Sequence, residues 1–202
     1  MNDQVGFIDN NCSFTLPNYL DSIIFSDNCD SLLNISQIPI SGSVINSDTI
    51  ITITASDLSG NTYSCSFNIL LFDVISPTIL CPSNVVIDND PTICGANYNY
   101  LTPVGLDNCI STTSLISGLP SGSLFPNGLT TNVFQVTDTA GNIATCNFYI
   151  LVNDVESPII NCPQDTSLPY NENCAVEVPD FSNLLLTSDN CGIETIIQSL
   201  SL

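Results

Sequence analysis

Cysteine is the residue type with the widest range of possible chemistry in this 202-residue chain, which has ten cysteines. No two of them form the Cys-x-x-Cys pair that is typical of zinc sites. Even numbers of cysteines in small domains are typical of disulfide frameworks, which persist in oxidising compartments. We therefore predict a disulfide-stabilised protein that is secreted or displayed at the cell surface. The cysteines are Cys12, Cys29, Cys65, Cys81, Cys94, Cys109, Cys146, Cys162, Cys174 and Cys191.

The composition excludes several kinds of chemistry. The chain has no Lys, Arg or His but 20 Asp and Glu, which gives a formal net charge of −20. Without cationic side chains, nucleic acid and anionic membranes are excluded as partners, and without His there is no Ser–His–Asp triad. No apolar run reaches the ~18 residues of a membrane-spanning helix. Paired carboxylates could serve a glycosidase, but no repeated pattern sets two of them in a cleft, so we predict no enzymatic activity.

The motif Asp-Asn-Cys occurs three times, at 27–29, 107–109 and 189–191, and another cysteine precedes it each time. Such self-similarity at a fixed period is the signature of a repeat architecture. The period of about 81 residues is the size of one small domain, so the chain is expected to contain tandem domains.

Two further motifs follow the same period. Asp-x-x-Gly-Asn, with a cysteine four residues later, begins at Asp57 and again at Asp138. Asp-Val-x-Ser-Pro-x-Ile-x-Cys-Pro begins at Asp73 and again at Asp154. The second motif predicts short linkers between consecutive repeats, in which proline restricts the backbone.

The first and third repeats are of one type, because residues 11–17 resemble residues 173–179. On this register the first repeat, 1–73, lacks its first strand. The second repeat, 74–154, is complete. The third, 155–202, is the N-terminal half of a domain, and plain truncation of a longer array explains this better than strand exchange between copies.

Residue patterns favour strands throughout. Segments 49–55 and 131–137 are rich in β-branched residues, and segments 65–69 and 146–152 alternate apolar with polar residues. Asp-x-x-Gly-Asn stands between them and predicts hairpin turns, since Gly and Asn accept positive φ. No stretch has helical periodicity. The sequence therefore predicts an all-β protein of small antiparallel sandwiches.

These motifs resemble the hyalin repeat, or HYR domain. The resemblance implies tandem immunoglobulin-like sandwich domains in extracellular adhesive or matrix proteins, without catalytic residues. The first repeat departs from the pattern at 45–48, where Ile-Asn-Ser-Asp replaces Phe-Pro-x-Gly. The middle repeat has every part of the pattern, namely Pro77, Ile79, Cys81, Pro82, Cys94, Asp107, Asn108, Cys109, Phe125, Pro126, Gly128, Thr130, Asp138, Gly141, Asn142 and Cys146.

Four cysteines per repeat allow three connectivities, which the sequence leaves open. The sandwich that the resemblance implies puts the first strand beside the last. Cys65 and Cys162 then remain, either with partners in sequence outside this chain or in bonds between neighbouring copies. The pairs expected by analogy are Cys81–Cys146, Cys94–Cys109, Cys12–Cys29 and Cys174–Cys191.

Five aspartates recur at fixed places in the repeats. One interpretation is Ca²⁺ binding, since Ca²⁺ prefers carboxylate and carbonyl oxygens. The other is that each carboxylate caps a turn by accepting from nearby backbone amides. No other cofactor is expected. The five are Asp27, Asp73, Asp107, Asp154 and Asp189.

Glycosylation is a further expectation. Asn11 and Asn34 stand in Asn-x-Ser motifs. Four other sites resemble the Asp-Ser/Thr-apolar motif of bacterial O-glycosylation, and glycans there would cover an apolar surface. These sites are Ser22, Ser31, Thr49 and Thr139.

The function that fits these features is structural. We expect a non-catalytic extracellular repeat protein of a cell-surface stalk, fibre or filament, whose partner is itself, as a homopolymer or a longer tandem array. The alternative is an adhesin module that binds glycan or protein through its loops. That alternative predicts an aromatic-rich concave patch, whereas the chain has no Trp and only 7% aromatic residues.

Overall fold

The computed structural model describes residues 2–28 and 33–199, and its regular structure there consists of strands and two 3₁₀ turns. In the described part of the chain, neither turn has the length or apolar character to cross a membrane. The chain divides into two compact units, each containing one complete junction between consecutive repeats. Unit 1 comprises 1–80, 103–114 and 134–146, and unit 2 comprises 81–102, 115–133 and 147–202.

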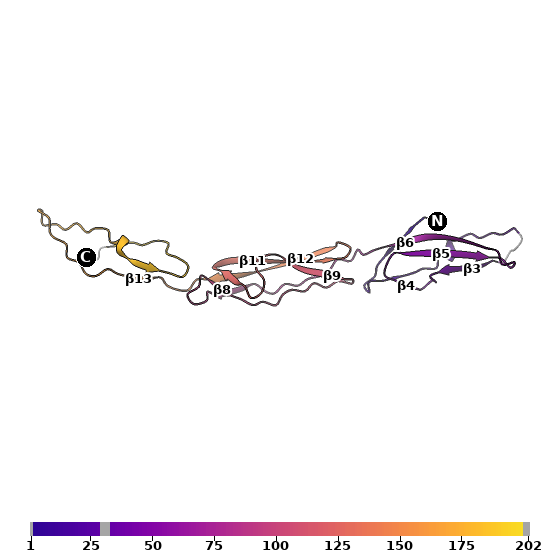
Figure 1. Ribbon diagram of the computed structural model, residues 1–202, viewed down its shortest axis with the longest axis horizontal. Helices are drawn as coiled ribbons and strands as arrows, with labels where there is room; N and C mark the ends of the chain where they lie inside the picture. Colours follow the sequence, from indigo (N-terminus) through magenta and orange to yellow (C-terminus); the bar gives the residue numbers. More distant parts are fainter. Residues whose placement is uncertain (1, 29–32, 200–202) are drawn as a thin grey trace. The chain divides into compact units, whose positions relative to one another are not determined.

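The first repeat forms a four-stranded sheet in the order β1-β6-β5-β3, accompanied by the short pair β2-β4 (Figure 1). Strands β5 and β6 form an antiparallel hairpin, and β3 pairs antiparallel with β5. The edge strand β1 runs parallel to β6. The bounds are β1 Gln4–Phe7, β2 Phe14–Thr15, η1 Leu20–Ser22, β3 Asn34–Ile38, β4 Val44–Ile45, β5 Thr49–Ser56 and β6 Thr62–Phe72.

The core of unit 1 arises from the alternation along β5 and β6. Every second residue of these strands points to one face, where Ile51, Ile53, Phe67 and Ile69 are buried together with Leu16. The Tyr19 ring packs edge-on against Phe67, with centroids 5.1 Å apart. Burial of such side chains stabilises a small domain by about 1.5–3 kcal/mol each.

The middle repeat has the sheet order β7-β12-β11-β9 and the short pair β8-β10. Its first strand, β7, runs parallel to its last, β12, with Val85 opposite Ile150. This pairing confirms that the first strand lies beside the last. Strand β1 occupies the same place beside β6 in the first repeat, so that repeat does not lack the strand that corresponds to β7. The bounds are β7 Val85–Asp88, β8 Gly95–Asn97, β9 Ser111–Ser117, β10 Leu124–Pro126, β11 Gly128–Asp138 and β12 Ile143–Asn153.

Aromatic residues fill the core of unit 2. Tyr100 lies edge-on to Phe148 at 5.0 Å and to Phe125 at 6.5 Å between centroids. Its hydroxyl donates to the main-chain oxygen of Leu119 at 2.8 Å, so the polar end of the buried ring is satisfied. Burial around the ring raises the pKa of Tyr100 above its ordinary value.

The third repeat shares details with the first. The pair β13 (Ile159–Asn161) and β14 (Leu186–Ser188) is antiparallel, and η2 (Ser182–Leu184) corresponds to η1. The Gln198 side-chain amide donates a hydrogen bond to Pro179 O at 3.0 Å, and the Gln37 amide donates to Pro17 O at 3.2 Å in the first repeat. These similarities agree with the prediction that the two repeats are of one type.

The strand and hairpin predictions are confirmed. The hairpin turns carry Gly60 and Gly141 at φ of 89° and 93°, and all four predicted segments lie in β5, β6, β11 and β12. The all-β sandwich class is confirmed, with the difference that β1 and β7 pair in parallel. The domain boundaries at 73 and 154 stay a prediction, because the two compact units run across the repeats.

Candidate functional site: the repeat junctions

Two disulfides join consecutive repeats. Cys12 is bonded to Cys109 and Cys94 to Cys191, with Cα–Cα distances of 5.0 and 4.7 Å and a sequence separation of 97 in both cases. Each bond links the cysteine before one Asp-Asn-Cys motif to the Asp-Asn-Cys motif of the next repeat. The expected pairs Cys12–Cys29, Cys94–Cys109 and Cys174–Cys191 are therefore wrong. Cys174 has an exposed, unbonded thiol, and Cys29 lies outside the described residues.

The direction of β1 explains the actual pairing. Since β1 is parallel to β6, the loop that follows β1 lies at the end of the sheet where β6 runs into the linker. The main-chain amide of Ile8 donates to Phe72 O at 3.0 Å, which fixes this neighbourhood. Cys12 thus faces the following repeat, to which it is bonded at Cys109.

The Cys12 loop is a tight turn held by Asp9. The backbone of Cys12 has φ of 56°, and its amide donates to Asp9 O at 3.1 Å. The Asp9 carboxylate accepts from the amides of Asn11 and Ser13 at 2.9 and 3.1 Å. The hydrogen bond from Asn11 contributes most to lowering the pKa of Asp9. The hydrogen bonds within the loop therefore fix the conformation in which Cys12 forms its disulfide.

A spacing signal for this pairing was present in the sequence. Within repeats the two cysteines are 17, 15 and 17 residues apart, whereas across repeats the separation is constant. Cys81 and Cys146 are both disulfide-bonded, and their mutual pairing stays a prediction. Cys65 and Cys162 have unbonded thiols in the described structure, and nothing tests where their partners lie.

An asparagine side chain completes the first junction. Asn108 Nδ2 donates to Asp9 O at 3.1 Å, and it lies 3.3 Å from Asp73 Oδ2 in the linker. The amide thereby connects the cysteine loop of one repeat, the linker and the Asp-Asn-Cys turn of the next repeat. This role of asparagine was not anticipated from the sequence, although the position recurs three times.

The second junction repeats the arrangement inside unit 2. Asn190 Nδ2 donates to Ile93 O at 3.1 Å and to Asp154 Oδ1 at 3.3 Å. The linker residue Glu156 adds a contact, because both its carboxylate oxygens accept from the Thr92 amide at 3.0 Å. Two junctions with different loop sequences therefore use the same asparagine contact.

The first linker is also held along its backbone. Asn142 Nδ2 donates to Asp73 O at 3.1 Å and to Ile75 O at 3.4 Å. Beyond it, Thr78 and Leu106 form a β-bridge, with N–O distances of 2.7 and 2.8 Å. Residues 73–78 are thus fixed to the second repeat rather than forming a flexible spacer.

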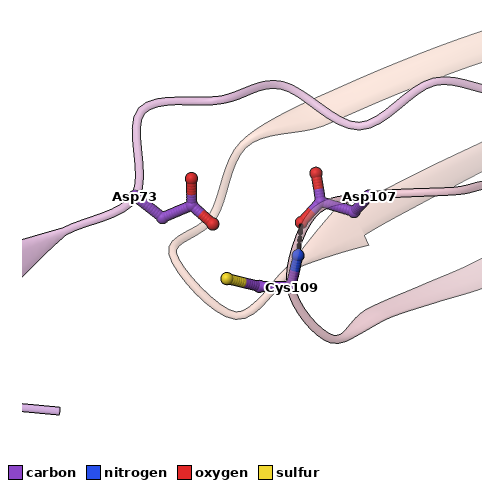
Figure 2. Close-up of side chains that lie close together, drawn as sticks. All are labelled: Asp73, Asp107 and Cys109. Carbon is purple, nitrogen blue, oxygen red and sulfur yellow. Dashed lines mark hydrogen bonds between the residues drawn. The ribbon is translucent and has the colours of Figure 1, made fainter. Parts of the chain in front are cut away.

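Two carboxylates and a sulfur atom lie together at the first junction (Figure 2). The ligand atoms of Asp73, Asp107 and Cys109 lie within 4.8 Å of one another. Cys109 Sγ is part of a disulfide, so it is not a thiolate ligand. Asp107 Oδ1 is buried without a hydrogen-bond partner among the described residues. Oxygen donors in this arrangement suit Ca²⁺, and Ca²⁺ binding remains a prediction.

The turn-capping interpretation of the aspartates is confirmed at four positions. In each case a side-chain oxygen accepts from the amide two residues later, as the dashed line in Figure 2 shows for Asp107. Such bonds satisfy backbone donors in tight turns. The pairs are Asp73 with Ile75 at 3.0 Å, Asp107 with Cys109 at 3.0 Å, Asp154 with Glu156 at 3.1 Å and Asp189 with Cys191 at 2.8 Å.

The glycosylation candidates are mostly accessible. Asn11, Asn34, Ser22 and Thr139 are exposed. Thr49 is half-buried, and its hydroxyl donates to Ser47 O at 2.8 Å. Ser31 lies outside the described residues. Whether any of these sites carries a glycan stays a prediction.

Comparison with known proteins agrees with this architecture. The family model described as HYR domain matches residues 72–152. The chain is 34% identical over 134 residues to Sushi, von Willebrand factor type A, EGF and pentraxin domain-containing protein 1 of Rattus norvegicus, covering 63% of this chain and 4% of that protein. It is 29% identical over 163 residues to hyalin of Strongylocentrotus purpuratus, covering 75% and 13%. The chain therefore spans a small part of these relatives.

Solved structures with a similar arrangement of strands include cadherin fragments. Human CDH23 EC21-23 shares 12% identity at a TM-score of 0.35, covering 82% of this chain and 79% of that one. Drosophila N-cadherin EC1-4 shares 12% identity at a TM-score of 0.33, covering 75% and 48%. These overlaps are too low to carry an argument. The family match instead assigns residues 72–152 to the HYR domain family, and the motifs of that segment recur on both sides of it.

Proposed function

We propose that this chain is part of a load-bearing array of HYR repeats, in which disulfides between neighbours stiffen an extracellular stalk, fibre or filament. The observation that carries the proposal is the pair of inter-repeat bonds, Cys12–Cys109 and Cys94–Cys191. Its family and its disulfides make the chain an extracellular repeat of the adhesion type without catalytic function.

The physical reason is the number of covalent connections at a junction. A single linker lets two domains rotate about its backbone bonds, and relative motion is then the default. Here each junction has the linker and, in addition, a disulfide at another point of both repeats. Two separate attachments remove most rotations, and the amides of Asn108 and Asn190 add polar contacts.

Chain composition supports a structural role. A net charge of −20 without any cationic side chain gives strong self-repulsion between repeats, which favours extension over collapse. Disulfides hold the junctions together against this repulsion. A partner that binds such an array would meet the loops of many copies, so adhesion and stiffness are compatible.

The test measures whether repeats tumble together. In the oxidised full chain, ¹⁵N relaxation should give residues on the two sides of the second junction the same rotational correlation time. The double variant Cys94→Ser, Cys191→Ser removes only that disulfide, and residues 159–199 should then tumble faster than β11 and β12.

The matched control replaces thiols that form no bond in the described structure, Cys65→Ser with Cys162→Ser. This variant should leave the correlation times unchanged. If the Cys94→Ser, Cys191→Ser variant tumbles like the oxidised parent, the disulfides do not stiffen the array and the proposal is wrong.

A further inference from the structure

The single Asn-Gly pair of the sequence lies beside the cysteine loop of the second junction. Asn127 is the one residue between strands β10 and β11. Its main-chain amide donates to Cys94 O at 3.4 Å, and Pro126 before it lies opposite Gly95 in the β8-β10 pair. A change in the backbone at Asn127 would therefore act directly on the loop that carries the Cys94–Cys191 disulfide.

The backbone conformation explains the glycine of this pair but not the asparagine. Gly128 has φ of 98°, a left-handed conformation that favours glycine. The side chain of Asn127 is exposed and makes no hydrogen bond within the described part of the chain. It differs in this from Asn108 and Asn190, whose amides are held at the two junctions. The Asn127 carboxamide is therefore free to approach the next peptide group.

This arrangement suits an attack of the Gly128 main-chain nitrogen on Cγ of Asn127. Glycine has no side chain to hinder the approach, and no atom beyond the neighbouring residues lies within 4 Å of the position that a Cβ at 128 would take. The new N–Cγ bond closes a succinimide ring as the Cγ–Nδ2 bond breaks, and the amide leaves as ammonia with the proton of the main-chain nitrogen. Water then opens the ring at either carbonyl carbon, with its hydroxyl on that carbon and its proton on the nitrogen.

We propose that Asn127 is a site of spontaneous deamidation, through which the second junction loosens as the protein ages. Hydrolysis at Cγ gives aspartate with an unchanged backbone. Hydrolysis at the main-chain carbonyl gives isoaspartate, in which the backbone runs through Cβ and Cγ and is one carbon longer. That carbon lies between the amide that bonds Cys94 O and strand β11. Because thiol–disulfide exchange depends on access to the sulfur atoms, a loosened loop makes the Cys94–Cys191 bond easier to reduce.

The first repeat contains a natural comparison. Asn46 stands 11 residues before the hairpin-turn residue Asp57, as Asn127 stands 11 residues before Asp138, and both asparagines are exposed. Asn46 is followed by Ser47, so the nitrogen that would attack carries a hindering side chain on its own residue. Asn46 should therefore deamidate at least severalfold more slowly than Asn127.

The experiment follows both asparagines in the oxidised full chain during incubation in H₂¹⁸O at neutral pH and physiological temperature. Pepsin releases the peptides, because a chain without Lys or Arg has no trypsin site. Mass spectrometry should find the amide of Asn127 replaced by an ¹⁸O-labelled carboxylate, with isoaspartate among the products. Ser47→Gly should raise the rate at Asn46 to about that at Asn127, and Asn127→Gln should abolish the reaction at position 127.

A second measurement tests the effect on the junction. Molecules that contain isoaspartate are separated by ion exchange, reduced with dithiothreitol, alkylated and analysed by mass spectrometry. Their Cys94–Cys191 bond should be reduced severalfold faster than in the fresh chain, whereas Cys12–Cys109 in the same molecules should be unaffected. Asn127→Asp adds the carboxylate without the extra carbon and should behave like the fresh chain, as should Asn127→Gln aged in parallel.

Two results would overturn the inference. One is an equal rate of deamidation at Asn127 and Asn46, and the other is a Cys94–Cys191 bond that is reduced equally fast before and after ageing. The reaction requires the disulfide of the second junction but not the stiffness that the proposed function assigns to it. A rigid second junction with an inert Asn127 would refute this inference and leave the proposed function standing.

Discussion

Asn108 donates a hydrogen bond from Nδ2 to the main-chain oxygen of Asp9 at 3.1 Å, although the two residues are 99 positions apart. The same amide hydrogen atoms lie close to the Asp73 carboxylate, with Nδ2 3.3 Å from Oδ2. One neutral side chain therefore supplies donors to two acceptors from the preceding repeat and the linker. In a chain without Lys, Arg or His, amides do the work that cationic side chains do elsewhere.

Replacing this amide should weaken the first junction. Asn108→Ala removes one of the donors to Asp9 O and to the Asp73 carboxylate, which keep the amides of Cys12 and Ile75. We expect about 1–3 kcal/mol lower stability to urea. Asn108→Asp should be worse at neutral pH, because it puts a third carboxylate beside Asp73 and Asp107. The exposed Asn46 offers a control, since Asn46→Ala should be neutral; equal loss in both alanine variants would contradict the assigned role.

The loop of Cys12 should tolerate one substitution and not another. Asp9→Asn should preserve the loop, because Asn171 makes the equivalent two hydrogen bonds in the third repeat. Asp9→Ala removes the acceptor for the amides of Asn11 and Ser13. We expect dithiothreitol to reduce the Cys12–Cys109 bond severalfold faster in Asp9→Ala than in Asp9→Asn, measured by alkylation and mass spectrometry. Similar rates for the two variants would show that the carboxylate does not hold the loop.

Acid should destabilise the hairpin turns. The side-chain hydrogen bond from Asn61 lowers the pKa of Asp57. For Asp138, burial acts to raise the pKa, but hydrogen bonds from Asn142 and the turn amides outweigh it, so the pKa is lowered. A lowered folded-state pKa gives stability that is complete above the unfolded value of about 3.9 and is lost as the pH falls through the folded value.

The thermal midpoint should therefore fall below about pH 4 when measured in high salt, which screens the general repulsion between carboxylates. Asp138→Asn should reduce the slope of stability against pH in this acid range, by up to about one proton taken up on unfolding. An acid limb that is the same in the parent and in Asp138→Asn would argue against the turn as its source.

Two glycines with the same backbone angle should respond differently to alanine. Gly118 and Gly128 both have φ of 98°. A Cβ at Gly118 would collide with the buried Asn132, whose Oδ1 accepts from Leu119 N at 2.8 Å, whereas nothing lies within 4 Å at Gly128. Gly128→Ala should lower stability by about 1 kcal/mol from the backbone alone, and Gly118→Ala by about 3 kcal/mol or more. Calorimetry would show this difference, and equal losses would place Asn132 elsewhere.

Calcium should raise the thermal midpoint if Asp73 and Asp107 hold it. The expected gain in the free energy of unfolding is about 2.7 kcal/mol at a Ca²⁺ concentration of 100 times the dissociation constant. Asp107→Asn should remove most of the gain, whereas Asp57→Asn, in a hairpin turn away from the junction, should keep it. Titration calorimetry with NaCl at equal ionic strength separates binding from screening. A gain that survives in Asp107→Asn would exclude this pair of carboxylates as the site.

The fold was predictable because its signals are local. Alternation along 65–69 and 146–152, and glycine at the turns that contain Gly60 and Gly141, specify β6, β12 and their hairpins without reference to the rest of the chain. The parallel pairing of β1 and β7 was not predictable in this way. It depends on which edge of the sheet remains open once the hairpins have formed, and the four residues of each strand do not specify its direction.

The residues at the junction could be named from the sequence, but the prediction of which cysteines pair was wrong. Cys12, Cys109, Asp73 and Asp107 were all identified, yet the cysteines were expected to pair inside their repeats. Which cysteines meet depends on the end of the domain at which each loop emerges, and that follows from the direction of β1. Asn108 gave no signal of its own, because an asparagine before a cysteine is equally consistent with an ordinary turn.

The overlap of the two disulfide-closed segments has a consequence for proteolysis. One segment runs from Cys12 to Cys109 and the other from Cys94 to Cys191, so residues 94–109 belong to both. A protease that hydrolyses any single peptide bond between positions 12 and 191 leaves two fragments that are still covalently joined. An array with this pattern would therefore stay covalently connected after an isolated proteolytic cleavage and would not lose its outer part.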